Sequence, residues 1–317
     1  TTPAVQTRRV ITIILALAAV LAAFALFGDL RDVRDRLGGF HWPVLAAAIG
    51  LAGANYVLRF VRWHLYLRAR DLDVPVPTSG LVFVAGFSMA VTPGKLGELI
   101  KSFLLRDLTG TPVAASASIV IAERVSDLLA LLVLAVIGVA IYGVAVKVVL
   151  ACTAIIAIGF AFIVWRTLAT WLIELVTRPA RLRGLRPKLL EVHAGIGALA
   201  RPTVLAWSTA LATAAWTCEG LGFALIVGGF PGAAVGVGLA LLIYAATTIA
   251  GALSFLPGGL GVTEGAMTLL LVRAATGLDT ASALDATLLT RLATLWFAVV
   301  LGLACLALAQ RRAAILR

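Results

Sequence analysis

Charged residues are scarce in this chain. Asp, Glu, Lys and Arg together make up only 13% of its 317 residues, while hydrophobic residues make up 62%. A soluble domain averages about 25% charged and about 45–50% apolar residues. The composition therefore excludes a soluble globular protein and predicts an all-α membrane protein that crosses the bilayer several times.

Cysteine and histidine are also scarce, with three residues of each. The cysteines show no C-x-x-C spacing and the histidines do not form a ligand pair, so neither a disulfide framework nor a metal site is expected. The nucleotide-binding pattern G-x-x-x-x-G-K-[ST] is absent. We therefore expect no metal, no cofactor, no catalytic group and no ATP-driven step. The residues are Cys152, Cys218, Cys305, His41, His64 and His193.

Acidic residues are outnumbered, with 15 Asp and Glu against 26 Lys and Arg. In a helical membrane protein such a basic excess gathers in cytoplasmic loops, so we expect no nucleic-acid partner. Placing the clusters in the cytoplasm puts both termini there and predicts a basic loop at about 166–201 of an inner-membrane protein. The clusters are Arg8/Arg9, Arg59–Arg70, Arg166–Arg201 and Arg311–Arg317.

Six uninterrupted apolar runs approach the length of about 20 helical residues that a membrane core requires. Two further runs, Gly80–Val91 and Gly232–Leu256, each end at a Pro-Gly pair. The first is roughly 18 Å of helix and too short to span, and a span through the second would put the basic C-terminus outside. The six runs are Val10–Phe27, Pro43–Leu58, Val113–Tyr142, Val148–Trp165, Thr203–Val227 and Ser282–Ala309.

Both interrupted runs are predicted to form re-entrant hairpins, over residues 80–107 and 232–276. In the first, a half-helix after Pro93 runs to Asp107 and carries Lys101 and Arg106 back to the cytoplasmic side. The second enters and leaves from the outer face. Irregular backbone at membrane depth is tolerated only where protein or water covers it, so both breaks should face an internal cavity.

The two breaks belong to similar segments, at about 79–144 and 232–309. Each has a P-G-x-x-G pattern, and an Arg lies fourteen residues beyond a downstream Gly: Arg124 after Gly110, and Arg291 after Gly277. Since the charge pattern opens one copy inward and the other outward, we predict an inverted repeat in a single membrane domain over 1–317. This architecture is common among secondary transporters.

Each resuming half-helix presents unpaired N–H groups and a positive dipole end at its break. These ends lie at Gly94 and Lys95 in the first repeat and at Gly258 and Gly259 in the second. Together they predict a binding site for a phosphate or a carboxylate. The alternative is that the glycines only permit close packing.

Five segments carry a family resemblance: Arg59–Trp63, Pro93–Glu98 with Arg106, Glu123–Asp127, Pro257–Glu264, and Arg291 with Trp296. Over essentially the whole chain, they resemble the flippase-like domain of lysylphosphatidylglycerol synthases and its stand-alone relatives. The resemblance implies a bundle of hydrophobic helices that moves a lipid head group between leaflets. The synthases continue into an aminoacyl-transferase domain. The residues up to Arg317 do not contain such a domain, so we expect no lysyl transfer.

Arg124 and Arg291 lie about 12 and 10 residues into their predicted helices, roughly 18 and 15 Å deep. An Arg at that depth costs at least about 2.5–3.5 kcal/mol and should face the interior with a partner. One interpretation is that each guanidinium holds a lipid phosphate. The other pairs each Arg with a carboxylate, Glu98 or Glu264, as a structural lock.

Four carboxylates adjoin these arginines. Glu98 and Glu264 are predicted in the first turn of the half-helices, where they either cap the helix or act as switches that couple a proton gradient to transport. Glu123 and Asp127 flank Arg124 and either tune its charge or neutralise it. Glu219 is an isolated carboxyl within an apolar run, and the sequence assigns it no role.

Arg59 and Arg62 lie with Trp63 and Tyr66 near the cytoplasmic end of the second predicted span. Such a group indicates either an ordinary aromatic and basic belt at the membrane interface or a site that recruits anionic head groups.

The resulting hypothesis is a flippase for an anionic lipid, either a phospholipid or a polyprenyl-phosphate carrier of the cell envelope. Its partners are that lipid and the bilayer. A lipid-binding scaffold for a biosynthetic enzyme and an intramembrane lipid-modifying enzyme are the alternatives, and a homo-oligomer stays open.

Overall fold

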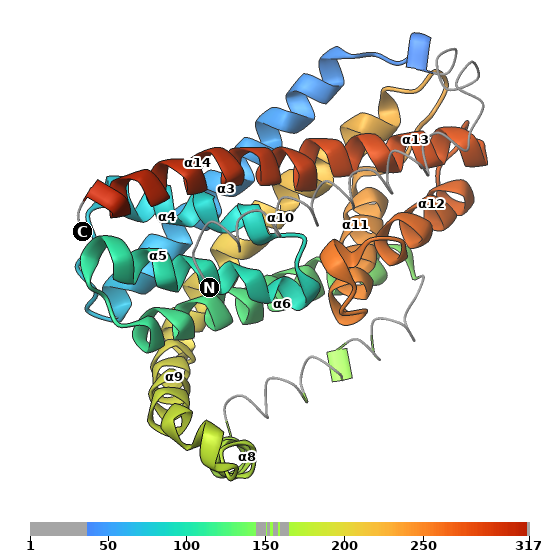
Figure 1. Ribbon diagram of the computed structural model, residues 1–317. Helices are drawn as coiled ribbons and strands as arrows, with labels where there is room; N and C mark the ends of the chain where they lie inside the picture. Colours follow the sequence, from blue (N-terminus) through green and yellow to red (C-terminus); the bar gives the residue numbers. More distant parts are fainter. Residues whose placement is uncertain (1–36, 144–149, 151–152, 155–157, 159–164, 316–317) are drawn as a thin grey trace.

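A computed structural model describes residues 37–143, 150, 153–154, 158 and 165–315 (Figure 1). The described part is almost entirely helical, and its β structure is limited to one isolated bridge between Ala234 and Thr276. The predicted span Val10–Phe27 and most of Val148–Trp165 lie outside the described residues.

Four described helices are long and apolar enough to cross a membrane: α3 (Pro43–Ala69), α6 (Val113–Tyr142), α10 (Pro202–Gly228) and a continuous helix over Thr280–Ile315. They coincide with four of the six predicted spans. At 1.5 Å per residue, 27 residues extend about 40 Å, more than a hydrocarbon core of about 30 Å. The described chain is thus an all-α, multi-pass membrane protein.

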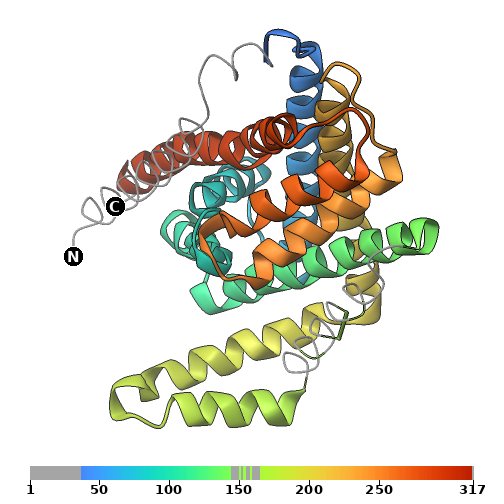
Figure 2. The same ribbon diagram turned by 90° about the vertical axis from the view of Figure 1, so that its right-hand side faces the viewer.

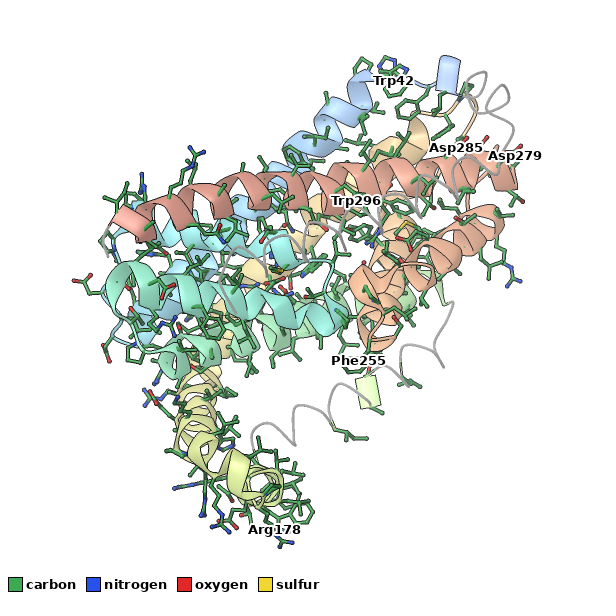
Figure 3. The ribbon with its side chains drawn as sticks, viewed as in Figure 1. Trp42, Arg178, Phe255, Asp279, Asp285 and Trp296 are labelled. Atoms are coloured by element: carbon green, nitrogen blue, oxygen red, sulfur yellow. The ribbon has the colours of Figure 1, made fainter. Side chains whose placement is uncertain are left out.

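The helix over Thr280–Ile315 has three parts. These are α13 (Thr280–Arg291), the π-helix η5 (Leu292–Trp296) and α14 (Phe297–Ile315). This helix extends across the bundle (Figure 1). Trp296 lies near its middle (Figure 3).

Two shorter interrupted segments complete the bundle. The first consists of α4 (Val76–Gly86), η1 (Phe87–Met89), η2 (Pro93–Leu99) and α5 (Ile100–Thr109). The second consists of α11 (Val237–Leu253), η4 (Pro257–Gly259) and α12 (Val262–Ala274). In each, the resuming half-helix packs on the long helix that follows it, α5 on α6 and α12 on α13.

The two breaks contact each other but differ in backbone. In the first, residues 93–99 form a 3-10 helix, and Thr92 Oγ1 accepts a hydrogen bond from Gly97 N at 2.8 Å. In the second, Gly258 and Gly259 have φ values of 62° and 67°, a left-handed conformation that residues with a side chain rarely adopt. Similar P-G-x-x-G patterns therefore produce a seven-residue 3-10 helix in one case and a three-residue 3-10 turn with left-handed glycines in the other.

The core of the bundle is the contact between α3 and α10, with α6 and α11 against them. The predicted basic loop at 166–201 is instead mostly helical, comprising α8 (Arg166–Val176), η3 (Ala180–Leu185) and α9 (Arg186–Leu199). This hairpin projects away from the bundle, with Arg178 near its tip (Figures 2 and 3). The two helices contact each other, and the cytoplasmic placement of this basic segment stays a prediction.

Gly302 on α14 allows the C-terminal helix to approach η1. A Cβ there would meet backbone atoms of Ser88 and Phe87, whereas a Cβ on Gly53 of α3 would meet no atom within 4 Å. We expect Gly302→Ala to lower the unfolding free energy by about 1–3 kcal/mol, as overpacking of a rigid contact does. Thermal unfolding of the detergent-solubilised protein measures the effect.

Gly53→Ala is the matched control, and better helix propensity should leave it equal to the parent or up to about 1 kcal/mol more stable. Equal unfolding temperatures for the two variants would contradict this account of the α14–η1 contact.

Candidate functional site: a charged cavity between the two breaks

Asp127 on α6 is the centre of a buried charge cluster. Its Oδ1 lies 2.8 Å from Nη2 of Arg62, and its Oδ2 lies 3.1 Å from Nη2 of Arg124. The indole N–H of Trp216, on α10, donates to Oδ1 at 3.2 Å. Because a buried carboxylate must satisfy its lone pairs, these contacts tie α3, α6 and α10 together.

Lys101 holds the first half-helix against α6. Its Nζ lies 2.5 Å from Glu123 Oε2 and 3.3 Å from Glu98 Oε2, and 4.6 Å from the centroid of the Trp63 ring. The residue is only 1% exposed. The prediction that Lys101 returns to the cytoplasmic surface is therefore wrong, because two carboxylates and an aromatic ring hold its ammonium inside the bundle.

Arg124 connects the first break to α6. Its Nη2 lies 3.2 Å from Glu98 Oε2, in addition to its contact with Asp127. Glu98 belongs to η2, just before the first residue of α5, Ile100, and it takes part in an ion pair. The Arg124 side chain is 22% exposed and reaches the cavity described below.

The second break carries the equivalent ion pair. Nε of Arg291 lies 2.6 Å from Glu264 Oε1, and its Nη2 donates to the carbonyl oxygen of Gly258 at 2.6 Å. Glu264 Oε2 accepts from the backbone N–H of Gly261 at 2.7 Å, so this residue caps α12 as well as pairing with the arginine. An ion pair thus joins each break to the long helix that follows it: Glu98–Arg124 in the first case and Glu264–Arg291 in the second.

Glu219 and two tyrosines line the α10 and α3 side of the site. The hydroxyl of Tyr244, on α11, donates to Glu219 Oε2 at 2.5 Å. The hydroxyl of Tyr56, on α3, donates to the carbonyl oxygen of Thr294 at 2.6 Å. Thr294 lies in the π-helix η5, a geometry that is rare and often found at functional sites.

Arg59 is the most loosely held cation of the group. Its Nη2 lies 3.9 Å from Asp127 Oδ2, whereas the other four cations each have a carboxylate within 3.3 Å. Its Nε–H has no acceptor among the described residues, and its guanidinium carbon lies 5.4 Å from the centroid of Phe87. The side chain is nevertheless only 7% exposed, so Arg59 has hydrogen-bond donors to offer inside the protein.

These groups surround a cavity of about 270 Å³. One part of its wall is charged, and another is apolar and extends to Phe255, which is 70% exposed at the edge of the molecule (Figure 3). Phe255 has a φ of 53°, unusual for a residue with a large side chain. The charged wall consists of Arg59, Arg124, Arg291, Glu98, Asp127 and Glu219, and the apolar wall includes Leu128, Leu131, Leu253, Phe255 and Leu256.

The predicted site residues divide into two groups. Arg59, Arg124, Arg291, Gly258 and Gly259 line the cavity together with Glu98 and Asp127. Behind them, Arg62 pairs with Asp127, Glu264 pairs with Arg291, and Glu123 pairs with Lys101. Gly94 lies in η2 beside Lys95, and the side chain of Lys95 is outside the described part. Among the described residues, no group of three or more His, Cys, Asp or Glu side chains is arranged to hold a metal ion.

The interface belt predicted around Arg62 is wrong. Arg62, Trp63 and Tyr66 are at most 1% exposed: Arg62 bonds to Asp127 and Ser126, Tyr66 bonds to Ser126, and Trp63 packs near Phe83 and Lys101. The sequence assigned no role to Lys101 or Tyr244 in the site. A signal for Lys101 was available, since it lies three residues after Glu98, on the same side of a helix.

Comparison with known proteins supports the membrane assignment. The family model described as the lysylphosphatidylglycerol synthase TM region matches residues 11–302. A UPF0104 membrane protein of Methanothermobacter thermautotrophicus is 30% identical over 122 residues, which cover 38% of this chain and 35% of that relative. The chain thus aligns with only about a third of that protein's length.

Removal of the Lys101 ammonium should destabilise the fold. Lys101→Met leaves Glu98 and Glu123 without their shared cation, and breaking a buried pair costs about 3–5 kcal/mol. A lowered unfolding temperature in detergent measures this, and Lys101→Met/Glu123→Gln should recover part of the loss because one stranded charge is gone.

The matched control is Arg186→Gln, which breaks the exposed pair with Glu174 on the projecting hairpin and should cost less than about 1 kcal/mol. If Lys101→Met unfolded at the same temperature as this control, the ion pairs of Lys101 with Glu98 and Glu123 would not stabilise the fold.

Proposed function

Because the chain belongs to the family of lysylphosphatidylglycerol synthase transmembrane regions, we propose that it acts on membrane lipids as a flippase that moves an anionic lipid between leaflets. The head group would occupy the charged part of the cavity, and the chains would extend through its apolar part. The lipid is a phospholipid or a polyprenyl phosphate.

The observation that carries this proposal is Arg59. A guanidinium that is 7% exposed, lines a cavity and lies 3.9 Å from Oδ2 of Asp127 has an unsatisfied Nε–H and little contact with bulk water. A phosphate oxygen satisfies such donors better than a neutral ligand, because the guanidinium fork matches its geometry. Arg124 and Arg291, which also line the cavity, would add positive charge on its other walls.

The apolar wall favours an amphiphile over a water-soluble anion. Leu128, Leu131 and Leu253 continue the cavity toward the exposed ring of Phe255. A free phosphate or a small carboxylate would leave this apolar surface in contact with water, whereas lipid chains would cover it.

A transport cycle requires that the cavity open toward each leaflet in turn. We propose six spans and two hairpins of opposite orientation, as an inverted repeat in the inner membrane with both termini in the cytoplasm. The equivalent pairs Glu98–Arg124 and Glu264–Arg291 support this proposal, since each fastens one break to the next long helix. If the head group replaced the glutamate as the partner of one arginine, the corresponding hairpin would separate from its long helix while the other stayed in place.

Leaflet exchange in proteoliposomes tests the proposal. Vesicles contain the protein with head-group-labelled phosphatidylglycerol or labelled polyprenyl phosphate, and a membrane-impermeant quencher reports the outer leaflet. We expect exchange with the parent and a rate about ten- to a hundredfold lower for Arg59→Gln, which removes a charged hydrogen bond worth about 1.5–3 kcal/mol. Arg186→Gln, on the projecting hairpin, is the matched control and should exchange like the parent.

Two results would overturn the flippase. Lipid binding that depends on Arg59 without exchange above protein-free vesicles would indicate a lipid-binding scaffold. Chemical conversion of the labelled head group by the purified protein would indicate an enzyme.

The amphiphilic cavity also predicts a preference for lipids over their soluble head groups. Glycerol 3-phosphate should compete with labelled short-chain phosphatidylglycerol at least about a hundredfold more weakly than the unlabelled lipid does, because each buried CH₂ contributes about 0.8 kcal/mol. Competition binding in detergent measures the ratio. Equal competition would mean that the apolar wall does not contact the ligand.

A further inference from the structure

The projecting hairpin of α8, η3 and α9 carries a second amphiphilic surface, away from the cavity. Helix α8 packs on α9, and Ala169 is its buried residue. Another side of α8 is apolar yet open, with exposed fractions of 53% at Trp171 and 56% at Val176. This apolar face of α8 consists of residues spaced i, i+3, i+4, i+7 and i+8, which share one side of a helix: Leu168, Trp171, Leu172, Leu175 and Val176.

A polar side of α8 lies opposite its apolar face. Thr167, Thr170 and Glu174 occur at i, i+3 and i+7, and Thr167 and Glu174 are exposed. Trp165, which precedes the helix, is exposed as well. A short helix with one apolar side, one polar side and tryptophan at its edges is typical of a segment that lies in the interface of a membrane.

The hairpin is also strongly basic. Residues 166–193 contain six Lys and Arg and two Glu. Arg186 contacts Glu174, so its charge is already opposed. The other cations whose side chains the structure describes are exposed: Arg166, Arg178, Arg183 and Lys188. Water on the apolar face is unfavourable, and exposed cations attract anions, so a surface that is both apolar and anionic complements the hairpin best.

The direction of the hairpin suits contact with such a surface. In Figure 1, α14 runs from left to right and α8 is seen along its axis, while Figure 2 shows α8 lengthwise. Helix α8 therefore lies across the direction of the long C-terminal helix, as a helix in the plane of a membrane does. A Cβ on Gly195 of α9 would lie 2.6 Å from Ser118 Oγ, so α9 is held closely against the first turns of α6.

We propose that the α8–α9 hairpin lies on the anionic lipid surface of the leaflet at this end of the bundle. The apolar face of α8 enters the head-group region, and Arg178, Arg183 and Lys188 contact lipid phosphates. This surface is distinct from the candidate lipid cavity, whose lining residues come from other elements. The inference goes beyond the flippase and does not depend on it.

Site-specific fluorescence quenching in nanodiscs tests this placement. The full chain, with its three native cysteines replaced by alanine, carries a thiol-reactive fluorophore at Leu175→Cys on the apolar face or at Thr167→Cys on the polar side. Lipids that are spin-labelled near the head group quench a fluorophore that enters the bilayer. In nanodiscs of phosphatidylcholine with phosphatidylglycerol, we expect at least about twofold stronger quenching at Leu175→Cys than at Thr167→Cys. Added salt should weaken it, because salt screens the attraction.

A charge variant tests the recognition of anionic lipid. Each Lys or Arg near an anionic surface favours attachment by about fivefold. Arg178→Gln/Arg183→Gln should therefore lower the preference of the hairpin for phosphatidylglycerol over pure phosphatidylcholine nanodiscs by roughly 25-fold, measured by quenching at Leu175→Cys. The matched control is Arg311→Gln/Arg312→Gln on α14, which removes two exposed charges outside the hairpin and should keep the preference of the parent.

Hydrogen–deuterium exchange gives a measurement without a fluorophore. Backbone amides of residues 166–176 should exchange more slowly in nanodiscs that contain phosphatidylglycerol than in pure phosphatidylcholine, because contact with the interface excludes water from α8. The difference should be lost in Arg178→Gln/Arg183→Gln and kept in Arg311→Gln/Arg312→Gln.

The outcomes separate this inference from the flippase. Equal quenching at Leu175→Cys and Thr167→Cys, or none at either, overturns the placement of the apolar face in the bilayer. Quenching and exchange that are the same with and without phosphatidylglycerol overturn the recognition of anionic lipid. A parent that exchanges no lipid between leaflets overturns the proposed function and leaves the docking of the hairpin to these measurements.

Discussion

A charge inside a bundle of apolar helices must meet an opposite charge, and the described fold follows this constraint. Asp127 receives arginines from its own helix and from α3, while Lys101 joins carboxylates of η2 and α6. These contacts determine which faces of α3, α5 and α6 can pack together, since rotation of any one would strand a buried ion. Apolar side chains fill the space, but they are more nearly interchangeable and specify orientation less strongly.

The positions of Arg124 and Arg291 within long helices and the Pro-Gly breaks could be predicted because each depends on short-range sequence. A guanidinium far inside an apolar run needs an internal partner, and a Pro-Gly pair ends a helix wherever it lies. Four long helices followed from the apolar runs alone, although α3 continues past the predicted Leu58 to Ala69 and the last helix past Ala309 to Ile315. The pairing of each arginine with the glutamate of its own break was one of two interpretations that the sequence left open.

Other parts depended on contacts that sequence spacing does not specify. Arg62 looked like a residue of the membrane interface, but it is fully buried and bonds to Asp127 and Ser126 of α6, which only tertiary packing decides. Glu219 and Tyr244 come from different helices, 25 residues apart, and no local pattern joins them. The two breaks share a glycine pattern yet differ in backbone: Thr92 Oγ1 accepts from Gly97 N in the first, while the second has two left-handed glycines and carries Leu256 at the position of Thr92.

The π-helix η5 has a consequence for how one helix serves both halves of the bundle. A π-turn accommodates one additional residue, which corresponds to a rotation of about 100° between the surfaces on either side of it. On one side, α13 packs against α12 and α10; on the other, α14 packs against α4, α5 and η1. An unbroken α-helix of the same length would present a single continuous stripe, and that stripe could follow only one of these neighbourhoods. The change of helical phase at Leu292–Trp296 therefore lets one continuous helix pack against two differently oriented groups of helices.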